Sequence, residues 1–542
     1  MWKWRLAAAL VAVALGALAW LLPGVRRDLI QAIVKWDARP TEPAPLPAGD
    51  GPGLPPAPRT RVVLIDGLAE DVAKTLPVWS ALCARGVTLR VDVGFPTVSL
   101  PVAASLWTGL TQQQTGYMNR YNRPLDPPLG ARGIPAQVAG SIAIAEGLMV
   151  PKGDKVVPGN YGWIVRSLGF AHTEPAADPG SPIVDLGGEA WSKQWEEHAK
   201  AAIGSDARLV YVHLLRVDAA GHRAGLSDEY RRVAREADAT LGGLIAASPD
   251  ARWFLLSDHG LLPGGGHGGE ERAVRQVQAC IAGPGIAPAR GELVHAVDVA
   301  RALADSTGAT LDRDARGRPL SVALAAPLRG DQAVPPLALG AGAAAIFVLV
   351  AGLALATWGV RRWWLAPWWF FAGGALLVLL RAPPTLSMPM VFARDGRQMG
   401  LAWAPALPLA AAATWFGLRR TTLARVIVGQ LAIPLAAAAA ALTACGAWPT
   451  LLGERVAPVV PRYTAYASPL LLIAAHGAAA VALAVLATLV LPRSGRRGPA
   501  APPRSEPAAG APGRASASRD PADRADRARD RRARPGRPPV GQ

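Results

Sequence analysis

Three unbroken apolar runs in the central part of the chain each end near an acidic residue. The runs 61–65, 209–215 and 253–256 are each followed within three residues by an Asp. Such runs are typical of strands buried on both faces of a parallel sheet. Helical patterns such as residues 228–247 separate them, so the sequence predicts an α/β fold with a doubly wound, mostly parallel sheet. Ligands of such sheets bind beyond the carboxyl ends of the strands, where these Asp residues are expected.

Long apolar segments near both ends of the chain predict membrane helices. The run 6–22 follows Lys3 and Arg5 and has a length between those of a signal peptide and a membrane anchor. The later apolar segments favour an uncleaved anchor. Five of these segments are each near the length that crosses a bilayer, namely residues 337–358, 363–380, 401–418, 426–447 and 470–491.

The patterns divide the chain into five predicted parts. These are a membrane anchor or signal peptide (1–36), a Pro- and Gly-rich linker (37–59), an α/β catalytic domain (60–330), a five-helix transmembrane region (335–492) and a disordered Arg-rich tail (493–542). The loops on one side of the predicted spans carry the greater share of Arg and Lys. By the positive-inside rule, both termini lie in the cytoplasm and the catalytic domain lies outside it, in a multi-pass protein of the plasma (inner) membrane.

The net charge of +17 first suggests nucleic acid or anionic lipid as a partner. The tail after residue 492 accounts for +8 of it, because 13 Arg face five acidic residues there. Nucleic-acid binding by the folded domain is therefore not expected, whereas the tail could touch anionic lipid at the cytoplasmic face. The 51% hydrophobic content and the mean hydropathy of +0.21 agree with a soluble core plus membrane segments.

The cysteine count does not support a disulfide framework. Cys83, Cys280 and Cys445 lack the spacing of a zinc knuckle, and Cys445 falls within an apolar segment. Only Cys83 and Cys280 are candidates for pairing, and two unpaired core thiols are the favoured interpretation.

Carboxylates and imidazoles gather where the apolar runs end. Six of them form a set large enough for two divalent cations, namely Asp66, Asp218, His222, Asp258, His259 and His267. Asp218 and His222 are four residues apart, on one face of a helical turn. Carboxylate with imidazole fits zinc best, with manganese as the alternative. Two such cations could clamp a phosphoryl group and activate the attacking oxygen.

A nucleophile is expected in the segment 95–110, which follows the first apolar run. Its two hydroxyls, those of Thr97 and Ser99, come just before an amphipathic helical pattern. The N-terminus of a helix stabilises an alkoxide and an incoming phosphate, and metal coordination would make the hydroxyl a better nucleophile.

These motifs together resemble the alkaline phosphatase superfamily, in its type I phosphodiesterase/nucleotide pyrophosphatase branch. The similar segments lie in the same order along residues 60–325: Asp66, Pro96–Gly109, Asp218–His222, Ser257–Gly260 and Gly266–Gly268. In architecture the chain also resembles the ethanolamine phosphate transferases of glycosylphosphatidylinositol synthesis. One departure is that Val102-Ala103 follow Pro101, where many phosphodiesterases of this branch have Asn-His.

The resemblance implies a role for each of the candidate residues. Ser99 would be the nucleophile, with Thr97 as the runner-up, and Ser99 would also bind the metal held by Asp66, Asp258 and His259. Asp218, His222 and His267 would hold the other metal.

The implied activity is that of a metal-dependent phosphodiesterase or phosphatase that forms a phosphoserine on a phosphate ester, lipid-linked or not, at the outer membrane surface. A transferase that moves a head-group phosphate such as phosphoethanolamine would use the same residues. A metal-binding scaffold without activity is a third interpretation, disfavoured because every ligand position is filled.

Other polar residues receive structural interpretations from the sequence. His213 lies within an apolar run and is expected to be a core histidine, and Asp298 is expected to be structural. Solvated loops are the favoured interpretation for a group of residues that could otherwise meet a substrate, namely Arg120, Arg123, Lys152, Lys155, Asn160, Tyr161 and Trp163.

Overall fold

A computed structural model describes most of the central domain and parts of the two ends. It covers residues 2–34, isolated positions from 37 to 46, residues 49–328 with gaps at 119–124, 147–148, 153–154, 159–161 and 175–187, residues 406–418 and 422–427, isolated positions from 431 to 439, and residues 460–491. Residues 1–492 and 493–542 form two units. The predicted Arg-rich tail, the predicted spans at 337–358 and 363–380, and most of the span at 426–447 lie outside the described residues.

The described strands of the central domain form two sheets. The small sheet pairs β4 (Met149–Lys152) with β5 (Lys155–Pro158), and the large sheet has eight strands in the order β10-β2-β9-β8-β1-β7-β3-β6. Its strands are β1 (Thr60–Ile65), β2 (Val87–Asp92), β3 (Ile142–Ala145), β6 (His172–Glu174), β7 (Leu209–Leu214), β8 (Arg252–Leu256), β9 (Gln276–Ala282) and β10 (Ala289–His295). Of these, β9 runs antiparallel to both of its neighbours, and the remaining pairings are parallel. The predicted α/β fold with a mostly parallel sheet is confirmed.

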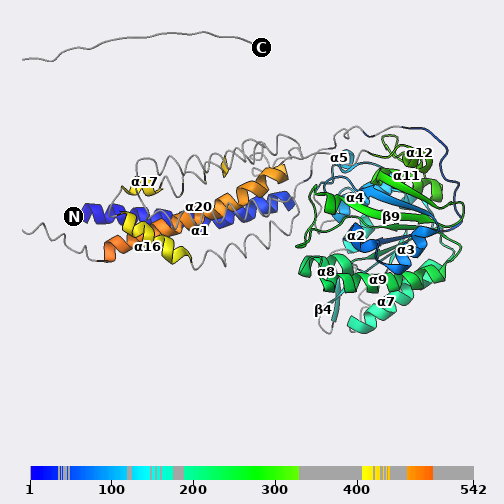
Figure 1. The fold of residues 1–542 in the computed structure, drawn as a ribbon, viewed down its shortest axis with the longest axis horizontal. Helices are drawn as coiled ribbons and strands as arrows, with labels where there is room; N and C mark the ends of the chain where they lie inside the picture. Colours follow the sequence, from blue (N-terminus) through cyan, green and yellow to red (C-terminus); the bar gives the residue numbers. More distant parts are fainter. Residues whose placement is uncertain are drawn as a thin grey trace, which may run out of the picture. The chain divides into compact units, whose positions relative to one another are not determined.

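Helices cover both faces of the sheet (Figure 1). One face carries α4 (Ser99–Thr108), α5 (Gln112–Thr115), α11 (Ala296–Thr307) and α12 (Leu320–Ala325). The other carries α2 (Glu70–Ala73), α3 (Pro77–Ala84), α7 (Gly188–Gly204), α8 (Arg216–Ala224) and α9 (Asp228–Ala247). Because the strands are covered on both sides, their residues read as continuous apolar runs rather than as an alternation.

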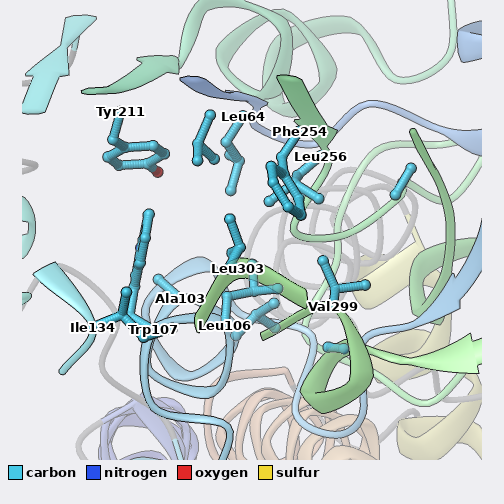
Figure 2. Packing of buried hydrophobic residues seen from close by; sticks show 14 of the residues in the cluster. Leu64, Ala103, Leu106, Trp107, Ile134, Tyr211, Phe254, Leu256, Val299 and Leu303 are labelled. Atoms are coloured by element: carbon cyan, nitrogen blue, oxygen red, sulfur yellow. The ribbon is translucent and has the colours of Figure 1, made fainter. Parts of the chain in front are cut away.

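A separate apolar core fills each side of the sheet. On the α4 and α11 side, Trp107 and Leu303 face Leu64, Tyr211 and Phe254 (Figure 2). The rings of Trp107 and Tyr211 pack edge to face with their centroids 5.3 Å apart. The rigid contact between α4 and the sheet fixes the N-terminal end of α4, where Ser99 lies, relative to the strand ends.

The cysteine interpretation was wrong. Cys83 of α3 and Cys280 of β9 form a disulfide with a Cα–Cα distance of 5.1 Å. The two residues are 197 positions apart and meet because β9 runs beneath α3, which no local pattern could show. A disulfide of this kind is typical of proteins that fold in an oxidising compartment.

Two described helices are long and apolar enough to cross a membrane. They are residues Trp2–Asp28 within α1 (Trp2–Val34) and Leu470–Val490 within α20 (Val460–Val490). Ala8 and Ala12 of α1 are buried in the same apolar cluster as Ala478 and Val481 of α20. Helices α16 (Ala406–Leu418) and α17 (Leu423–Ile427) are shorter.

Candidate active site and metal centre

The three apolar runs that end at acidic residues are three neighbouring strands, β8, β1 and β7. Asp66 directly follows β1, and Asp258 follows β8 after one intervening residue. Asp218 lies in the first turn of α8, which comes immediately after β7. Parallel strands end at the same edge of a sheet, and because these three strands are neighbours, their carboxylates lie close together.

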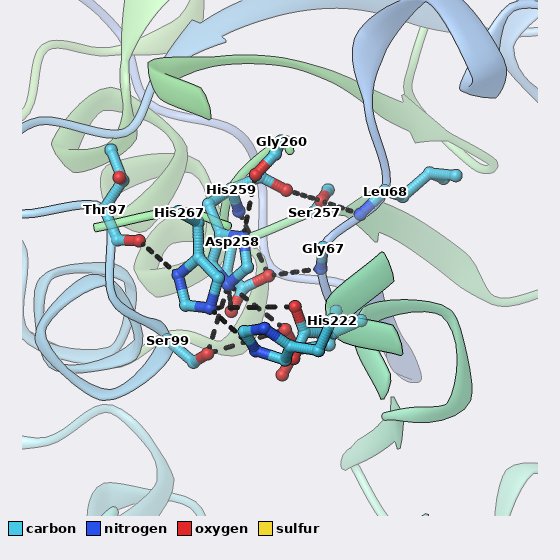
Figure 3. Close-up of polar contacts among 12 residues, drawn as sticks. Gly67, Leu68, Thr97, Ser99, His222, Ser257, Asp258, His259, Gly260 and His267 are labelled. Atoms are coloured by element: carbon cyan, nitrogen blue, oxygen red, sulfur yellow. Dashed lines mark hydrogen bonds and ion pairs between the residues drawn. The ribbon is translucent and has the colours of Figure 1, made fainter. Parts of the chain in front are cut away.

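The first cluster consists of Asp66, Asp258 and His259, all of them buried. Figure 3 shows Asp258 and His259 side by side. His259 Nε2 lies 3.3 Å from Asp66 Oδ1 and 3.5 Å from Asp258 Oδ2. The Ser99 hydroxyl completes the cluster, 3.3 Å from His259 Nε2 and 3.5 Å from Asp66 Oδ1. Four groups predicted to share one metal therefore converge in space.

The second cluster brings together Asp218, His222 and His267. His222 Nε2 lies 3.1 Å from Asp218 Oδ2 and 3.2 Å from His267 Nε2, and His267 Nε2 lies 3.7 Å from Asp218 Oδ1. Ligand atoms of Asp218, His259 and His267 also approach one another within 4.8 Å. The His259 and His267 rings stack with their centroids 3.6 Å apart, so the two clusters adjoin each other.

Two carboxylate oxygens indicate that these clusters suit cations. Asp258 Oδ2 and Asp218 Oδ1 are buried and accept no hydrogen bond from any residue that the structure describes. Both oxygens point into the clusters, because each lies within 4 Å of an imidazole Nε2. A buried carboxylate oxygen without a donor is costly, and a divalent cation would satisfy it. The donor set of carboxylates and imidazoles thus fits zinc or manganese.

The protonation of the clusters reflects burial and crowded charge. Burial, followed by the charge of Asp66, raises the pKa of Asp258 to about 7. Burial favours the neutral form of His259, but the Asp258 and Asp66 carboxylates outweigh it and raise its pKa to about 10. Burial lowers the pKa of His267 to about 3, which keeps that imidazole in the neutral form that binds a metal.

The two hydroxyls of the nucleophile segment have different surroundings. Ser99 is the first residue of α4, and its Oγ points into the first cluster (Figure 3). The Thr97 hydroxyl instead donates to the Gly269 carbonyl and accepts from the Gly268 N–H, both at 2.9 Å. The geometry therefore favours Ser99 over Thr97 as the attacking group.

The loop after β1 is held in place by buried side chains. Gly67 N–H donates to Asp258 Oδ1 at 3.1 Å, and Leu68 N–H donates to the Ser257 hydroxyl at 3.0 Å. The Tyr230 hydroxyl donates to the Gly67 carbonyl at 2.7 Å and accepts from the Ala69 N–H at 2.9 Å. Gly67 has a φ of +67°, and a Cβ there would lie 2.9 Å from Asp218 Cβ. Only glycine is therefore expected to fit between the two clusters at this position.

His213 is a site residue that its sequence interpretation did not recognise. It lies within β7 as expected and is buried, but its Nε2 is 3.1 Å from Asp66 Oδ2. Asp66 Oδ1 faces Ser99 and His259, so the two oxygens of this carboxylate have separate partners. The contact depends on the register of the sheet, in which His213 of β7 pairs with Leu64 of β1, two residues before Asp66.

The remaining candidates lie away from the clusters or outside the described side chains. Asp298 binds Arg318 at 2.7 Å in a buried ion pair and accepts from the His295 N–H, which are structural contacts. For the other candidates the structure describes no side chain: Arg120, Arg123, Lys152, Lys155, Asn160, Tyr161 and Trp163.

Residues 160–279 match the family of type I phosphodiesterase/nucleotide pyrophosphatase. The matched part contains five of the predicted ligands, Asp218, His222, Asp258, His259 and His267. For these residues the match confirms the predicted resemblance to the type I phosphodiesterase/nucleotide pyrophosphatase branch. Asp66 and Ser99 lie before the matched residues, and the fold brings them to the same site. The matched part of the chain is thus similar to enzymes of the phosphodiesterase and pyrophosphatase type.

Several solved structures match about half of the chain at low identity. Murine ectonucleotide pyrophosphatase/phosphodiesterase 5 is 14% identical over 47% of this chain and 96% of its own, with a TM-score of 0.35. A 2-O GAG sulfatase is 15% identical over 52% of this chain and 76% of its own, with a TM-score of 0.37. A protein of the alkaline phosphatase superfamily from Vibrio parahaemolyticus is 13% identical over 56% of this chain and 79% of its own, with a TM-score of 0.34. No curated protein matches the chain.

Proposed function

We propose that this chain is a membrane-bound, metal-dependent phosphoryl-transfer enzyme of the phosphodiesterase or phosphatase type. Its substrate is a phosphate ester at the outer membrane surface, and Ser99 carries the phosphoryl group as a phosphoserine. One observation carries the proposal: the Ser99 hydroxyl lies at the start of α4 and within 3.5 Å of both Asp66 and His259. A hydroxyl in that place meets both a metal cluster and the positive end of a helix.

Each group of residues has a defined part in this proposal. Asp66, Asp258 and His259 would hold one divalent cation beside Ser99, and Asp218, His222 and His267 would hold the other. When bound, such a pair of cations lowers the pKa of a nearby hydroxyl and offsets the charge of a phosphoryl group. The buried Asp258 Oδ2 and Asp218 Oδ1, which accept no hydrogen bond among the described residues, support this assignment.

The reaction would proceed in two displacements at phosphorus. Ser99 Oγ forms a bond to phosphorus while the bond from phosphorus to the leaving oxygen breaks, and the hydroxyl proton passes to solvent. The leaving oxygen takes up a proton from water. A water molecule then attacks the phosphoserine, the bond between phosphorus and Ser99 Oγ breaks, and the phosphate product leaves with Ser99 restored.

Transfer to another acceptor is the second candidate, because the chain has more apolar helices than a single anchor requires. Both α1 and α20 contain a segment that could span a membrane, and the two pack together. In this alternative a lipid or glycan hydroxyl replaces water in the second displacement, and the group transferred is a head-group phosphate such as phosphoethanolamine. The same side chains serve both reactions.

The location follows from two observations of different kinds. The Cys83–Cys280 disulfide supports a catalytic domain that folds outside the cytoplasm. The apolar helix α1 at the N-terminus and α20 near residue 480 support anchoring in the plasma membrane. The termini would then be cytoplasmic and the catalytic domain extracytoplasmic.

The experiment that tests the proposal compares two serines of α4. Full-length protein in detergent is incubated with zinc or manganese and a chromogenic phosphodiester, or with phospholipids labelled in the head group. The Ser99→Ala variant is expected to lose turnover, whereas Ser105→Ala retains it, because the Ser105 hydroxyl donates to the Pro101 carbonyl within α4. Equal turnover by wild type and Ser99→Ala would refute the assignment. Label that appears only on an added lipid or glycan acceptor would favour transfer.

A further inference from the structure

Thr97 joins the nucleophile segment to the loop that carries His267. Its side chain is fully buried. The hydroxyl donates to the Gly269 carbonyl and accepts from the Gly268 N–H, each at 2.9 Å, and the Thr97 carbonyl lies 2.9 Å from His267 Nδ1 (Figure 3). One residue thus contacts three consecutive residues of the loop.

The contact with the Thr97 carbonyl determines the tautomer of His267. A carbonyl oxygen only accepts, so Nδ1 must carry the proton. In the neutral imidazole Nε2 then has a free lone pair, and Nε2 is the atom that faces Asp218 and His222. A hydrogen bond of this kind on the far nitrogen is what orients a histidine that binds a metal.

The loop itself offers little side-chain anchoring around His267. Gly266 and Gly268 flank it, with φ values of +104° and +103°, a region that favours glycine. Glycine backbone is conformationally permissive, so the position of His267 depends on contacts made by the surrounding structure. The Thr97 hydroxyl supplies two of these contacts, one to Gly268 and one to Gly269.

We propose that Thr97 is a positioning residue for His267, which rests on the proposed role of His267 as a metal ligand. Thr97 sets the affinity of the cluster of Asp218, His222 and His267 for its cation. Because Thr97 is two residues from Ser99, it also fixes the distance between that cluster and the nucleophile. Its hydroxyl hydrogen is committed to the Gly269 carbonyl.

Three substitutions at position 97 test this role by metal binding rather than by turnover. Thr97→Val keeps the shape of the side chain and removes the hydroxyl, Thr97→Ala removes it without adding any new contact, and Thr97→Ser keeps it. Zinc is titrated into metal-free, full-length protein in detergent against a chromogenic chelator. We expect Thr97→Val and Thr97→Ala to weaken the binding of one zinc ion by about 10–100-fold, the range seen when an outer-shell partner of a metal ligand is removed. The affinity for the other zinc ion should stay within about threefold of the wild-type value.

Thr97→Ser is the rescue variant and is expected to bind both zinc ions like the wild type. Unchanged zinc affinities in Thr97→Val and Thr97→Ala would overturn the proposal, as would an equal weakening in Thr97→Ser. A further outcome would also overturn the proposal. If Thr97→Val binds zinc normally but has no turnover at saturating zinc, and Thr97→Ser restores turnover, then Thr97 is the nucleophile.

The result can be separated from a failure of the proposed function. Full turnover by Ser99→Ala would refute the nucleophile assignment. The zinc affinities of the Thr97 variants would still decide the positioning role, because they do not depend on turnover. Conversely, an inactive Ser99→Ala together with normal zinc binding by Thr97→Val and Thr97→Ala would refute the positioning role alone.

Discussion

Tyr230 holds the loop between the two clusters of Asp and His residues, and removing one oxygen atom from it tests that support. The side chain is fully buried, and burial raises the pKa of its hydroxyl, which therefore stays protonated and able to donate. It donates to the Gly67 carbonyl at 2.7 Å and accepts from the Ala69 N–H at 2.9 Å. The Tyr230→Phe substitution keeps the ring and deletes both hydrogen bonds.

The size of the effect follows from the two backbone groups left without partners. A buried donor or acceptor without a partner costs about 1–3 kcal/mol, so with partial relaxation of the loop we expect Tyr230→Phe to lower the free energy of unfolding by about 2–4 kcal/mol. For a domain of this size each kcal/mol lowers Tm by about 2–4 °C, which gives a fall of about 4–16 °C. Zinc binding should weaken as well, because Gly67 N–H also donates to Asp258 Oδ1.

The assay is thermal unfolding of the full-length protein in detergent, followed by tryptophan fluorescence with and without zinc. Tyr117→Phe serves as the control, because the Tyr117 hydroxyl donates to the Pro127 carbonyl at 2.6 Å and not to the loop between the clusters. Its zinc affinity should therefore stay that of the wild type. A Tyr230→Phe protein with the Tm and zinc affinity of the wild type would refute the reasoning about this loop.

Three further predictions concern other buried polar groups. His213→Leu should weaken zinc binding by about 10–100-fold, as measured by chelator competition, because it removes the contact between His213 Nε2 and Asp66 Oδ2. Unchanged binding would contradict this prediction. Arg318→Met should lower the free energy of unfolding by about 3–5 kcal/mol in a denaturant titration, because it leaves the Asp298 carboxylate buried without the Arg318 guanidinium. Arg313 is exposed, so Arg313→Met is the control, and an equal loss of stability in both variants would count against this prediction. Burial lowers the pKa of His295, so the unfolded chain binds a proton more readily than the folded protein, and stability should fall as the pH drops below about 6.5. In His295→Asn the Tm should depend less on pH over that range, and a pH dependence identical to that of the wild type would refute this prediction.

The central strands and the carboxylates beside their ends could be predicted from the sequence because both features are local. Each of β1, β7 and β8 is a continuous apolar run, and Asp66, Asp218 and Asp258 follow within a few residues, so strand and ligand are read from the same stretch. Their convergence then follows from the general rule that parallel strands end at one edge of the sheet.

Contacts between distant segments are what the sequence did not reveal. The antiparallel direction of β9 and the Cys83–Cys280 disulfide depend on how segments almost 200 residues apart pack together. His213 read as a core residue because its neighbours in β7 are apolar, and its contact with Asp66 depends on the register between β7 and β1. The Thr97 contacts likewise join residues about 170 positions apart.

Mass spectrometry of the covalent intermediate is the most direct test of Ser99 as the nucleophile. Full-length protein with zinc is mixed with a phosphate-ester substrate, quenched in acid during turnover and digested, and the peptide that contains both Ser99 and Thr97 is fragmented. We expect a substrate-dependent phosphoryl adduct on Ser99, present in the Ser105→Ala protein and absent from Ser99→Ala. An adduct on Thr97, or turnover by Ser99→Ala at the wild-type rate, would contradict this assignment.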